Sequence, residues 1–305
     1  MRPLPTIAIM AALLAGSLPP LSAEDIPLDN RAHPPAVASR DLTTPADLGI
    51  PAAATKPISL PATQNPSVGS VAATAMNHEV TASRAGTRRT PALYTGIRTN
   101  QRVLALTFDD GPSAELTPKL LDLLKKEGIR ATFFVIGTNV QAHPEIARRI
   151  VAEGHEIANH SWSHPQLPRL GAERLEQEIQ NTTDIIEQTT GQRVTMMRPP
   201  YGAINGRVKD AIIKTHGLDL LLWSVDPRDW TRPGPEAVER RLLAGAAPGA
   251  IMLCHDIHPG TIAAMPDTIA QLKAKGYSFA TVSELIAMDE PPPPKPVAAP
   301  KAKKV

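Results

Sequence analysis

The chain has no pair of cysteines, few aromatic residues and almost no excess of either charge. Cys254 is the only cysteine among 305 residues, which excludes a disulfide within the chain. Lysine and arginine total 32 against 30 acidic residues. The resulting net charge of +2 gives no indication of a nucleic-acid partner, and none is expected.

The few aromatic residues are concentrated in one part of the chain. Nine of the ten lie between Phe108 and Phe279, and the tenth is Tyr94. Aromatic side chains supply much of the apolar area of a core, so the preceding residues are poorly equipped to build one. One folded domain is therefore predicted over residues 95–288, long enough to bury most of the surface of its unfolded chain.

The apolar stretch near the start of the chain is too short to span a bilayer comfortably. Residues 7–18 form this stretch, which follows the positive Arg2. The pattern is typical of a secretory signal, which we assign to residues 1–23. Leu21 stands where a cleavage site has a small residue, so an uncleaved N-terminal membrane anchor is the alternative. We expect the protein to be exported, either to the periplasm or out of the cell.

Two further segments have compositions that do not favour a folded core. Residues 24–94 are rich in Ala, Pro, Thr and Ser and are predicted to form a disordered linker. Residues 289–305 contain Pro291–Pro294 and are predicted to form a disordered tail. The tail is basic, which suits a solvated end or, alternatively, attraction to an anionic envelope polymer; its lysines are Lys295, Lys301, Lys303 and Lys304.

Between the linker and the tail, β-rich segments alternate with helical ones. The first predicted helix has Thr117 as its cap and Pro118 at its first position, and Gly128 suits its end. This alternation argues for an α/β fold with parallel strands, in which functional loops follow the C-terminal ends of the strands. The predicted strands cover residues 102–108, 131–136, 154–159, 194–197, 218–225, 250–254 and 278–280.

Polar clusters follow two of the early strands. Asp109 and Asp110 stand side by side, and adjacent carboxylates repel unless a cation or a proton neutralises one of them. An ordinary acidic turn is the simpler interpretation of this pair alone. His160 and His164 have a spacing that suits metal ligands if the segment turns helically, although structural histidines are also common.

Three later strands end in similar clusters. Arg198 precedes two prolines, which hold the loop and suit a guanidinium that keeps a buried carboxylate ionised. Asp226–Trp230 and Leu253–His258 follow the next strands, and a histidine with nearby carboxylates is a candidate general acid. Cys254 lies in an apolar run, so its side chain is predicted to be buried in the core. A role for its thiol as a nucleophile is the less favoured alternative.

Together these clusters resemble the five ordered motifs of polysaccharide deacetylases with a NodB homology domain, carbohydrate esterase family 4. The similar region covers roughly residues 100–288. The resemblance implies an irregular, incomplete (β/α) barrel with about seven parallel strands. The matching motifs are Thr107–Pro112, His160–His164, Arg198–Gly202, Asp226–Trp230 and Leu253–His255.

The resemblance also implies a reaction, which is the metal-dependent removal of N-acetyl groups from an aminosugar polymer with release of acetate. The polymer would be peptidoglycan or a chitin-like polysaccharide. Asp110, His160 and His164 match the metal ligands of the family. Zinc is the usual ion, with cobalt or another divalent ion as the alternative.

The remaining roles are carried over in the same way. Asp109 matches the general base, with Arg198 as its partner, and His255 matches the general acid, oriented by Asp229. The backbone N–H of Tyr201 matches an oxyanion donor. The acetyl methyl group would be enclosed by two apolar side chains, those of Trp230 and Leu253.

Several points stay open at this level. Met196 and Met197 stand where the family often has aromatic residues, so the sugar platform is expected to differ. His258 is a second histidine near the proposed acid, and a supporting role for it is open. An O-acetyl esterase acting on xylan-type polymers uses the same residues, and a wall-binding relative without activity is the third alternative.

Overall fold

A computed structural model describes residues 89–289 of the chain. The predicted signal segment at residues 1–23, the predicted linker up to residue 88 and the tail from residue 290 lie outside the described residues. Within the described part, no helix combines the length and the apolar character that crossing a membrane requires.

Seven short strands form one parallel sheet, with strand order β1-β6-β5-β4-β3-β2-β7. An eighth strand, β8 (Ser278–Phe279), pairs in parallel with the start of β2. The seven are β1 (Leu93–Tyr94), β2 (Val103–Asp109), β3 (Thr132–Val135), β4 (Glu156–Asn159), β5 (Met196–Met197), β6 (Asp219–Leu221) and β7 (Ile251–His255).

The two ends of this sheet approach each other, and single bridges join them. Beyond the end of β6, Val225 pairs in parallel with Met252 of β7, and Gly96 pairs with Ala250. The backbone N–H of Ile97 also donates to the carbonyl of Gly249 at 2.9 Å. The strands therefore curl into an irregular, incomplete barrel, and the predicted fold class is confirmed.

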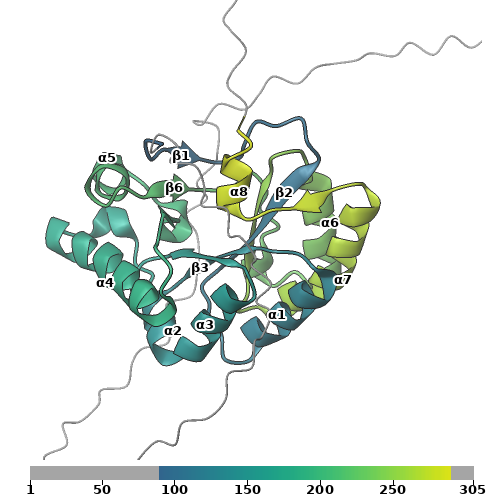
Figure 1. Cartoon of the computed structure of the whole chain (residues 1–305), viewed down its shortest axis with the longest axis horizontal. Helices are drawn as coiled ribbons and strands as arrows, with labels where there is room; N and C mark the ends of the chain where they lie inside the picture. Colours follow the sequence, from purple (N-terminus) through teal and green to yellow (C-terminus); the bar gives the residue numbers. More distant parts are fainter. Residues whose placement is uncertain (1–88, 290–305) are drawn as a thin grey trace, which may run out of the picture. The chain divides into compact units, whose positions relative to one another are not determined.

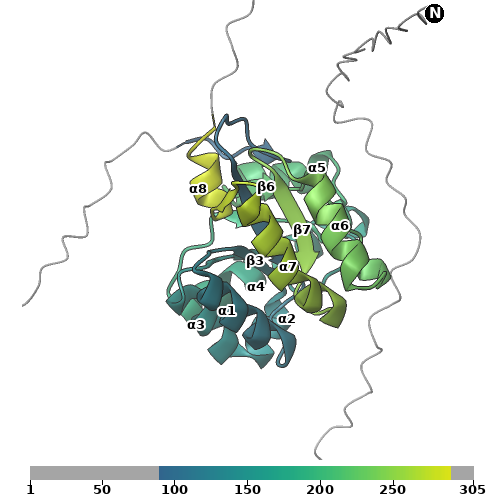
Figure 2. The same cartoon turned by 90° about the vertical axis from the view of Figure 1, so that its right-hand side faces the viewer.

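Helices lie around the outside of the strands (Figure 1), and α6 and α7 pack side by side beyond β7 (Figure 2). Shorter helical turns cover Leu167–Arg169, Pro200–Gly202, Ala211–Thr215 and Asp229–Thr231. The helices are α1 (Leu116–Glu127), α2 (Gly137–Ala142), α3 (Pro144–Ala152), α4 (Ala172–Thr190), α5 (Gly206–Asp210), α6 (Pro235–Gly245), α7 (Pro259–Ala274) and α8 (Val282–Ile286).

Strands β2, β3, β5, β6 and β7 are buried on both faces, as expected for a parallel sheet covered by helices. Alternate residues of β2 belong to different core clusters: Leu104 and Leu106 pack in the larger one, and Val103 and Ala105 in the smaller one. The smaller cluster also contains residues of α8. Because side chains alternate along a strand, Asp109 falls on the same face as Val103 and Ala105.

The start of α1 differs from the prediction. Thr117 was expected to cap this helix, but the helix begins at Leu116 and Thr117 lies within its first turn. The Thr117 hydroxyl accepts a hydrogen bond from the backbone N–H of Ser113 and donates one to the carboxyl group of Asp256. The side-chain oxygen of Thr117, which would have capped the helix, is thus used in a contact with a residue far away in the sequence. The predicted end at Gly128 is confirmed, with a left-handed φ of 64°.

Residues on both sides of the predicted domain limits make contacts with the domain. Leu93 and Tyr94, expected as the last linker residues, form β1 and pair with β6. Asp289, expected as the first tail residue, accepts a hydrogen bond from the backbone N–H of Arg98 at 3.2 Å. Both contacts involve backbone groups, which explains why composition did not reveal them.

Gly249 is predicted to be irreplaceable in closing the barrel. Its φ is +75°, and a Cβ atom built on it would lie 1.8 Å from the carbonyl oxygen of Ile97. Gly249→Ala should therefore lower the free energy of unfolding by about 3 kcal/mol or more, measured by urea denaturation. Gly206→Ala is the control, because no atom lies within 4 Å of its added Cβ. Equal stability of the two variants would contradict the prediction.

Candidate active site

The polar residues of the site end or directly follow β2, β4, β5 and β7, on the face of each strand that points into the barrel. Two positions before each of these polar residues stands a buried residue on the same face of the strand. The four buried residues are Thr107, Ala158, Met196 and Leu253. The polar side chains follow at the C-terminal edge of the sheet. They are those of Asp109, His160, Arg198 and His255. The structure thus brings together predicted residues that are up to 146 positions apart.

Four residues around this edge have a backbone conformation that is unusual for side chains other than glycine. The φ angles are 74° at Asp110, 68° at Ser161, 59° at His164 and 61° at Tyr201. Such conformations cost free energy and persist only where the surroundings impose them. At Asp110, the side-chain amide of Asn139 donates to the main-chain carbonyl at 2.7 Å and helps to hold the turn.

The loop that carries His160 and His164 is held from α4. Asn159 accepts a hydrogen bond from the backbone N–H of Ser161 at 2.8 Å, and its amide nitrogen donates to the carbonyl of Ile179. The buried carboxylate of Glu178 accepts from both the N–H and the hydroxyl of Ser163, at 2.8 and 2.7 Å. These contacts fix a short loop that would otherwise have no regular structure.

Asp110, His160 and His164 form a group that fits a divalent cation. Their candidate ligand atoms all lie within 4.8 Å of one another. Asp110 Oδ1 is 3.4 Å from Nε2 of His160 and 3.3 Å from Nε2 of His164. The same Oδ1 is buried without a hydrogen-bond donor among the described residues. A carboxylate oxygen facing two imidazole nitrogens in this way is a suitable donor set for zinc.

The other nitrogen of each imidazole contacts an oxygen. Nδ1 of His160 lies 2.7 Å from the main-chain carbonyl of Arg198, and Nδ1 of His164 lies 3.2 Å from the hydroxyl of Tyr201. A proton on Nδ1 satisfies the carbonyl and leaves Nε2 of His160 with a lone pair toward Asp110. Burial alone would raise the pKa of Asp110, but the imidazoles outweigh it and hold this pKa well below its usual range.

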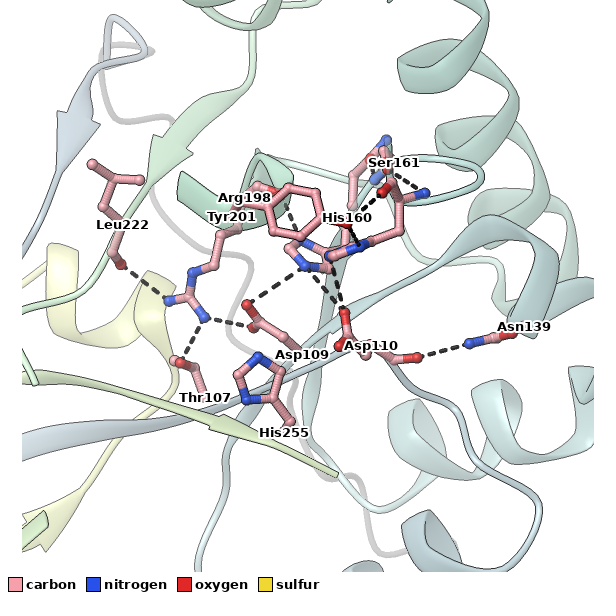
Figure 3. Close-up of polar contacts among 12 residues, drawn as sticks. Thr107, Asp109, Asp110, Asn139, His160, Ser161, Arg198, Tyr201, Leu222 and His255 are labelled. Atoms are coloured by element: carbon pink, nitrogen blue, oxygen red, sulfur yellow. Dashed lines mark hydrogen bonds and ion pairs between the residues drawn. The ribbon is translucent and has the colours of Figure 1, made fainter. Parts of the chain in front are cut away.

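Asp109 makes a different set of contacts from its neighbour Asp110. Its Oδ1 accepts from Nη1 of Arg198 at 2.6 Å, and its Oδ2 lies 3.7 Å from Nε2 of His160 (Figure 3). The guanidinium of Arg198 is 0% exposed and also donates to Thr107 Oγ1 at 2.8 Å and to the carbonyl of Leu222 at 3.1 Å. Each of the paired carboxylates therefore has its own positively charged or imidazole partners.

His255 lies beside Asp109, as its register partner on the adjacent strand β7, and is bound to Asp229. Nδ1 of His255 is 2.8 Å from Asp229 Oδ1, and Asp229 Oδ2 accepts from the backbone N–H of His255 and from the hydroxyl of Thr261. Burial lowers the pKa of His255, but the carboxylates of Asp229, Asp110 and Asp109 outweigh it and raise this pKa to about 10. The imidazole is thus held in its protonated form.

The three residues expected to contact substrate lie next to this centre. The ring of Tyr201 packs against that of His164 at a tilt of 59°, with ring centroids 4.6 Å apart. Leu253 is buried on β7 two positions before His255, and Trp230 is half-buried beside Asp229. Their roles toward a substrate stay predictions. Cys254 is fully buried in the larger core cluster, and burial raises the pKa of its thiol, so the nucleophile alternative is wrong.

Sequence reasoning missed several buried or half-buried polar residues that support the site. Asn139, Asn159, Glu178 and Thr261 each hold a site segment through the hydrogen bonds described above. Asp256 is also buried, against Gly111 and Thr117. The one sequence pattern that could have indicated them is a polar residue at a position where an apolar one is expected. Glu178 and Thr182 interrupt the apolar stripe of α4 in this way.

Comparison with known proteins gives the family. A family profile described as polysaccharide deacetylase matches residues 96–221. The chain is 41% identical over 189 residues to a chitooligosaccharide deacetylase of Rhizobium leguminosarum bv. trifolii, across 62% of this chain and 85% of that protein. The chain belongs to the polysaccharide deacetylase family. The resemblance inferred from the five motifs is therefore confirmed.

Other polysaccharide deacetylases are equally similar. A peptidoglycan-N-acetylglucosamine deacetylase of Listeria monocytogenes is 45% identical over 188 residues, which cover 62% of this chain and 39% of the relative. The chain thus spans about two fifths of that relative's length. The solved structure of the peptidoglycan deacetylase PdaC from Bacillus subtilis matches with a TM-score of 0.59 and 43% identity, over 62% of this chain and 92% of that one.

Tyr201→Phe should weaken metal binding without unfolding the protein. The substitution removes the hydroxyl beside Nδ1 of His164, and loss of such an outer partner typically weakens metal affinity by about 10-fold or more. Isothermal titration with zinc measures the change. Tyr277→Phe is the matched control, since the one contact of its hydroxyl among residues 89–289 is with the carbonyl of Ala246, outside the site. Unchanged affinity in Tyr201→Phe would show that the contact does not support His164.

The titration of His255 should depend on Asp229. The pKa of His255 in the folded protein is about 10, above that of a histidine in the unfolded chain. The His255–Asp229 pair therefore stabilises the folded state fully below about pH 6.5, and this stabilisation is lost as the pH rises through about 10. In metal-free protein, NMR titration should find the imidazole still protonated at neutral pH. Asp229→Asn should move the titration toward neutral pH, whereas the exposed Asp267→Asn should not. An imidazole of the wild-type protein that titrates near neutral pH would contradict this assignment.

Proposed function

We propose that this chain hydrolyses N-acetyl groups of an aminosugar polymer, peptidoglycan or a chitin-like polysaccharide, and releases acetate. The observation that carries the proposal is the convergence of three groups at one edge of the barrel. They are a donor set for a divalent cation, a carboxylate paired with a buried guanidinium, and an imidazolium paired with a buried carboxylate. Relatives named for both polymers support this substrate class.

Asp110, His160 and His164 are the proposed ligands of a divalent cation, and zinc is the ion we favour. The bound cation would supply a Lewis acid that polarises the acetyl carbonyl and makes a water molecule more acidic. The two Nε2 atoms and the unpartnered Oδ1 of Asp110 support this assignment. Two imidazoles and one carboxylate also leave open positions for water and substrate.

Asp109 is the proposed general base. Its Oδ1 is engaged by Arg198, whereas its Oδ2 lies on the side of His160, 3.7 Å from Nε2. Oδ2 is thus placed to take a proton from a water molecule that attacks the acetyl carbon. Arg198 cannot rotate away because Thr107, Leu222 and the ring of Phe134 surround it, so the carboxylate keeps its orientation.

His255 is the proposed general acid. Its Nδ1 is held by Asp229, so Nε2 is the nitrogen that donates a proton to the departing sugar amine. The raised pKa of His255 keeps that proton in place at neutral pH until the C–N bond breaks. Tyr201, through its backbone N–H, is the proposed oxyanion donor, and Trp230 and Leu253 are proposed to enclose the acetyl methyl group.

Two other functions use the same residues. An O-acetyl esterase for xylan-type polymers would need the same base and acid, and acetate release from matched N- and O-acetylated sugars separates it from the first proposal. A wall-binding protein without activity would typically lack a ligand or the base. Asp109, Asp110, His160 and His164 are all present and close together, which favours an enzyme.

The substrate class also suits an exported protein. We propose export because residues 1–23 have the pattern of a secretory signal. Cell fractionation with N-terminal sequencing of the mature protein tests this step. Recovery of the protein only from the cytoplasm would overturn it.

The purified protein loaded with zinc should release acetate from peptidoglycan or from chitooligosaccharides, and chelation should abolish the activity. Asp109→Asn should bind zinc normally but lower kcat by about 100-fold or more, because only the base is lost. Asp110→Ala should lose zinc binding as well as activity, since it removes a ligand. The exposed Asp267→Asn serves as the control. Full activity of Asp109→Asn would rule out Asp109 as the base.

A further inference from the structure

A cavity of about 180 Å³ lies beside the His255–Asp229 pair, between the turn at Asp229–Thr231 and the starts of α6 and α7. Its polar lining comes from Asp229, Thr261, Arg232 and His258, and its apolar lining includes Val238. Asp229 and Thr261 are already bound to each other. The side chains available to a ligand are therefore those of Arg232 and His258.

Neither of these side chains has a polar partner within residues 89–289. The guanidinium of Arg232 forms no ion pair with any carboxylate there, although Arg149, Arg174 and Arg198 each do. The imidazole of His258 makes no hydrogen bond in the same range and contacts only the ring of His255, with centroids 5.6 Å apart. A cation without a carboxylate, at the wall of a cavity, is a candidate binding group for an anion.

The position of the cavity relates it to the proposed reaction. Asp229 contributes both to the cavity and to the pair with His255, so a ligand bound there would lie next to the proton donor. The backbone of Arg232 is held in place, because its N–H donates to the carbonyl of Asp229 at 2.8 Å and its φ is 55°. The side chain of Arg232 is exposed, so its guanidinium is accessible to a substituent on a sugar bound at the site.

We propose that this cavity is a subsite for a short, carboxylate-bearing substituent of the polymer, bound by Arg232 and His258. The inference rests on the proposed function and narrows its substrate to an acidic aminosugar polymer. A guanidinium binds a carboxylate through two parallel hydrogen bonds, and the neutral His258 imidazole adds an N–H donor. The walls at Pro233, Val238 and Pro259 suit the hydrocarbon part of a lactyl ether, the substituent of muramic acid.

The surrounding charges are compatible with this assignment. Burial, and then the positive charge of His255, lower the pKa of His258, so it is a neutral donor at neutral pH. Glu236 is an acid near the lining, with its Oε2 3.6 Å from the position that a Cβ on Gly234 would occupy. It makes no ion pair with Arg232, whose charge remains available.

The test compares two substrates that differ only at the lactyl carboxyl groups, which are charged in one and neutral in the other. One is a tetrasaccharide of alternating N-acetylglucosamine and N-acetylmuramic acid, and the other is the same compound with its lactyl carboxylates converted into methylamides. The zinc-loaded wild-type protein should have a kcat/KM about 10-fold higher for the acid form, through KM. Arg232→Gln should remove this preference, Arg232→Lys should retain part of it, and His258→Gln should reduce it.

Two controls separate this subsite from general damage. Chitotetraose carries no carboxylate, so Arg232→Gln should deacetylate it at the wild-type rate. Arg240→Gln, an exposed arginine on α6 that also has no ion pair among residues 89–289, should behave as wild type on all three substrates. Equal use of acid and amide by the wild-type protein, or equal loss on all substrates in Arg232→Gln, would overturn the subsite alone. No acetate from any substrate would overturn the proposed function, and the subsite with it.

Discussion

The contact on which the rest of the site depends is the buried pairing of Arg198 with Asp109. A fully buried guanidinium is costly unless its donors are used. Here Nη1 and Nη2 reach Asp109, Thr107 and the carbonyl of Leu222, and Nε alone has no partner among the described residues. The main-chain carbonyl of the same arginine faces Nδ1 of His160. One residue therefore orients the carboxylate of Asp109 through its side chain and the imidazole of His160 through its main chain.

The sequence allowed the main features to be predicted because each rests on a local pattern. Buried strands of apolar residues that end in polar ones predicted both the parallel sheet and the edge where the site forms. The supporting residues could not be predicted in this way. Glu178 acts on Ser163 across 15 positions, and Asp256 binds Thr117 across 139, so their partners are set by the tertiary fold. The expected cap at Thr117 failed for this reason.

Barrel closure shows a second limit of sequence patterns. β1 has two residues, and its contacts with β6 are made by the main chain, so no alternation of side chains marks it. The same is true of the approach between Ile97 and Gly249. Gly249 is the one local sign of that approach. The reason for a glycine at this position becomes clear only once the carbonyl of Ile97 is known to lie against it. Backbone-to-backbone contacts are therefore the part of this fold that composition leaves undetermined.

Asp109 and Asp110 illustrate how the backbone completes what the sequence suggests. Neighbouring residues of a strand point to opposite faces, so two adjacent carboxylates would normally be separated by the sheet. Asp109 ends β2 and points inward, while the φ of 74° at Asp110 breaks the alternation and places its carboxylate against His160 and His164. Repulsion between the two is offset because Arg198 neutralises one and the imidazoles face the other. The left-handed turn at Asp110 is thus the geometric condition for having both carboxylates in one site.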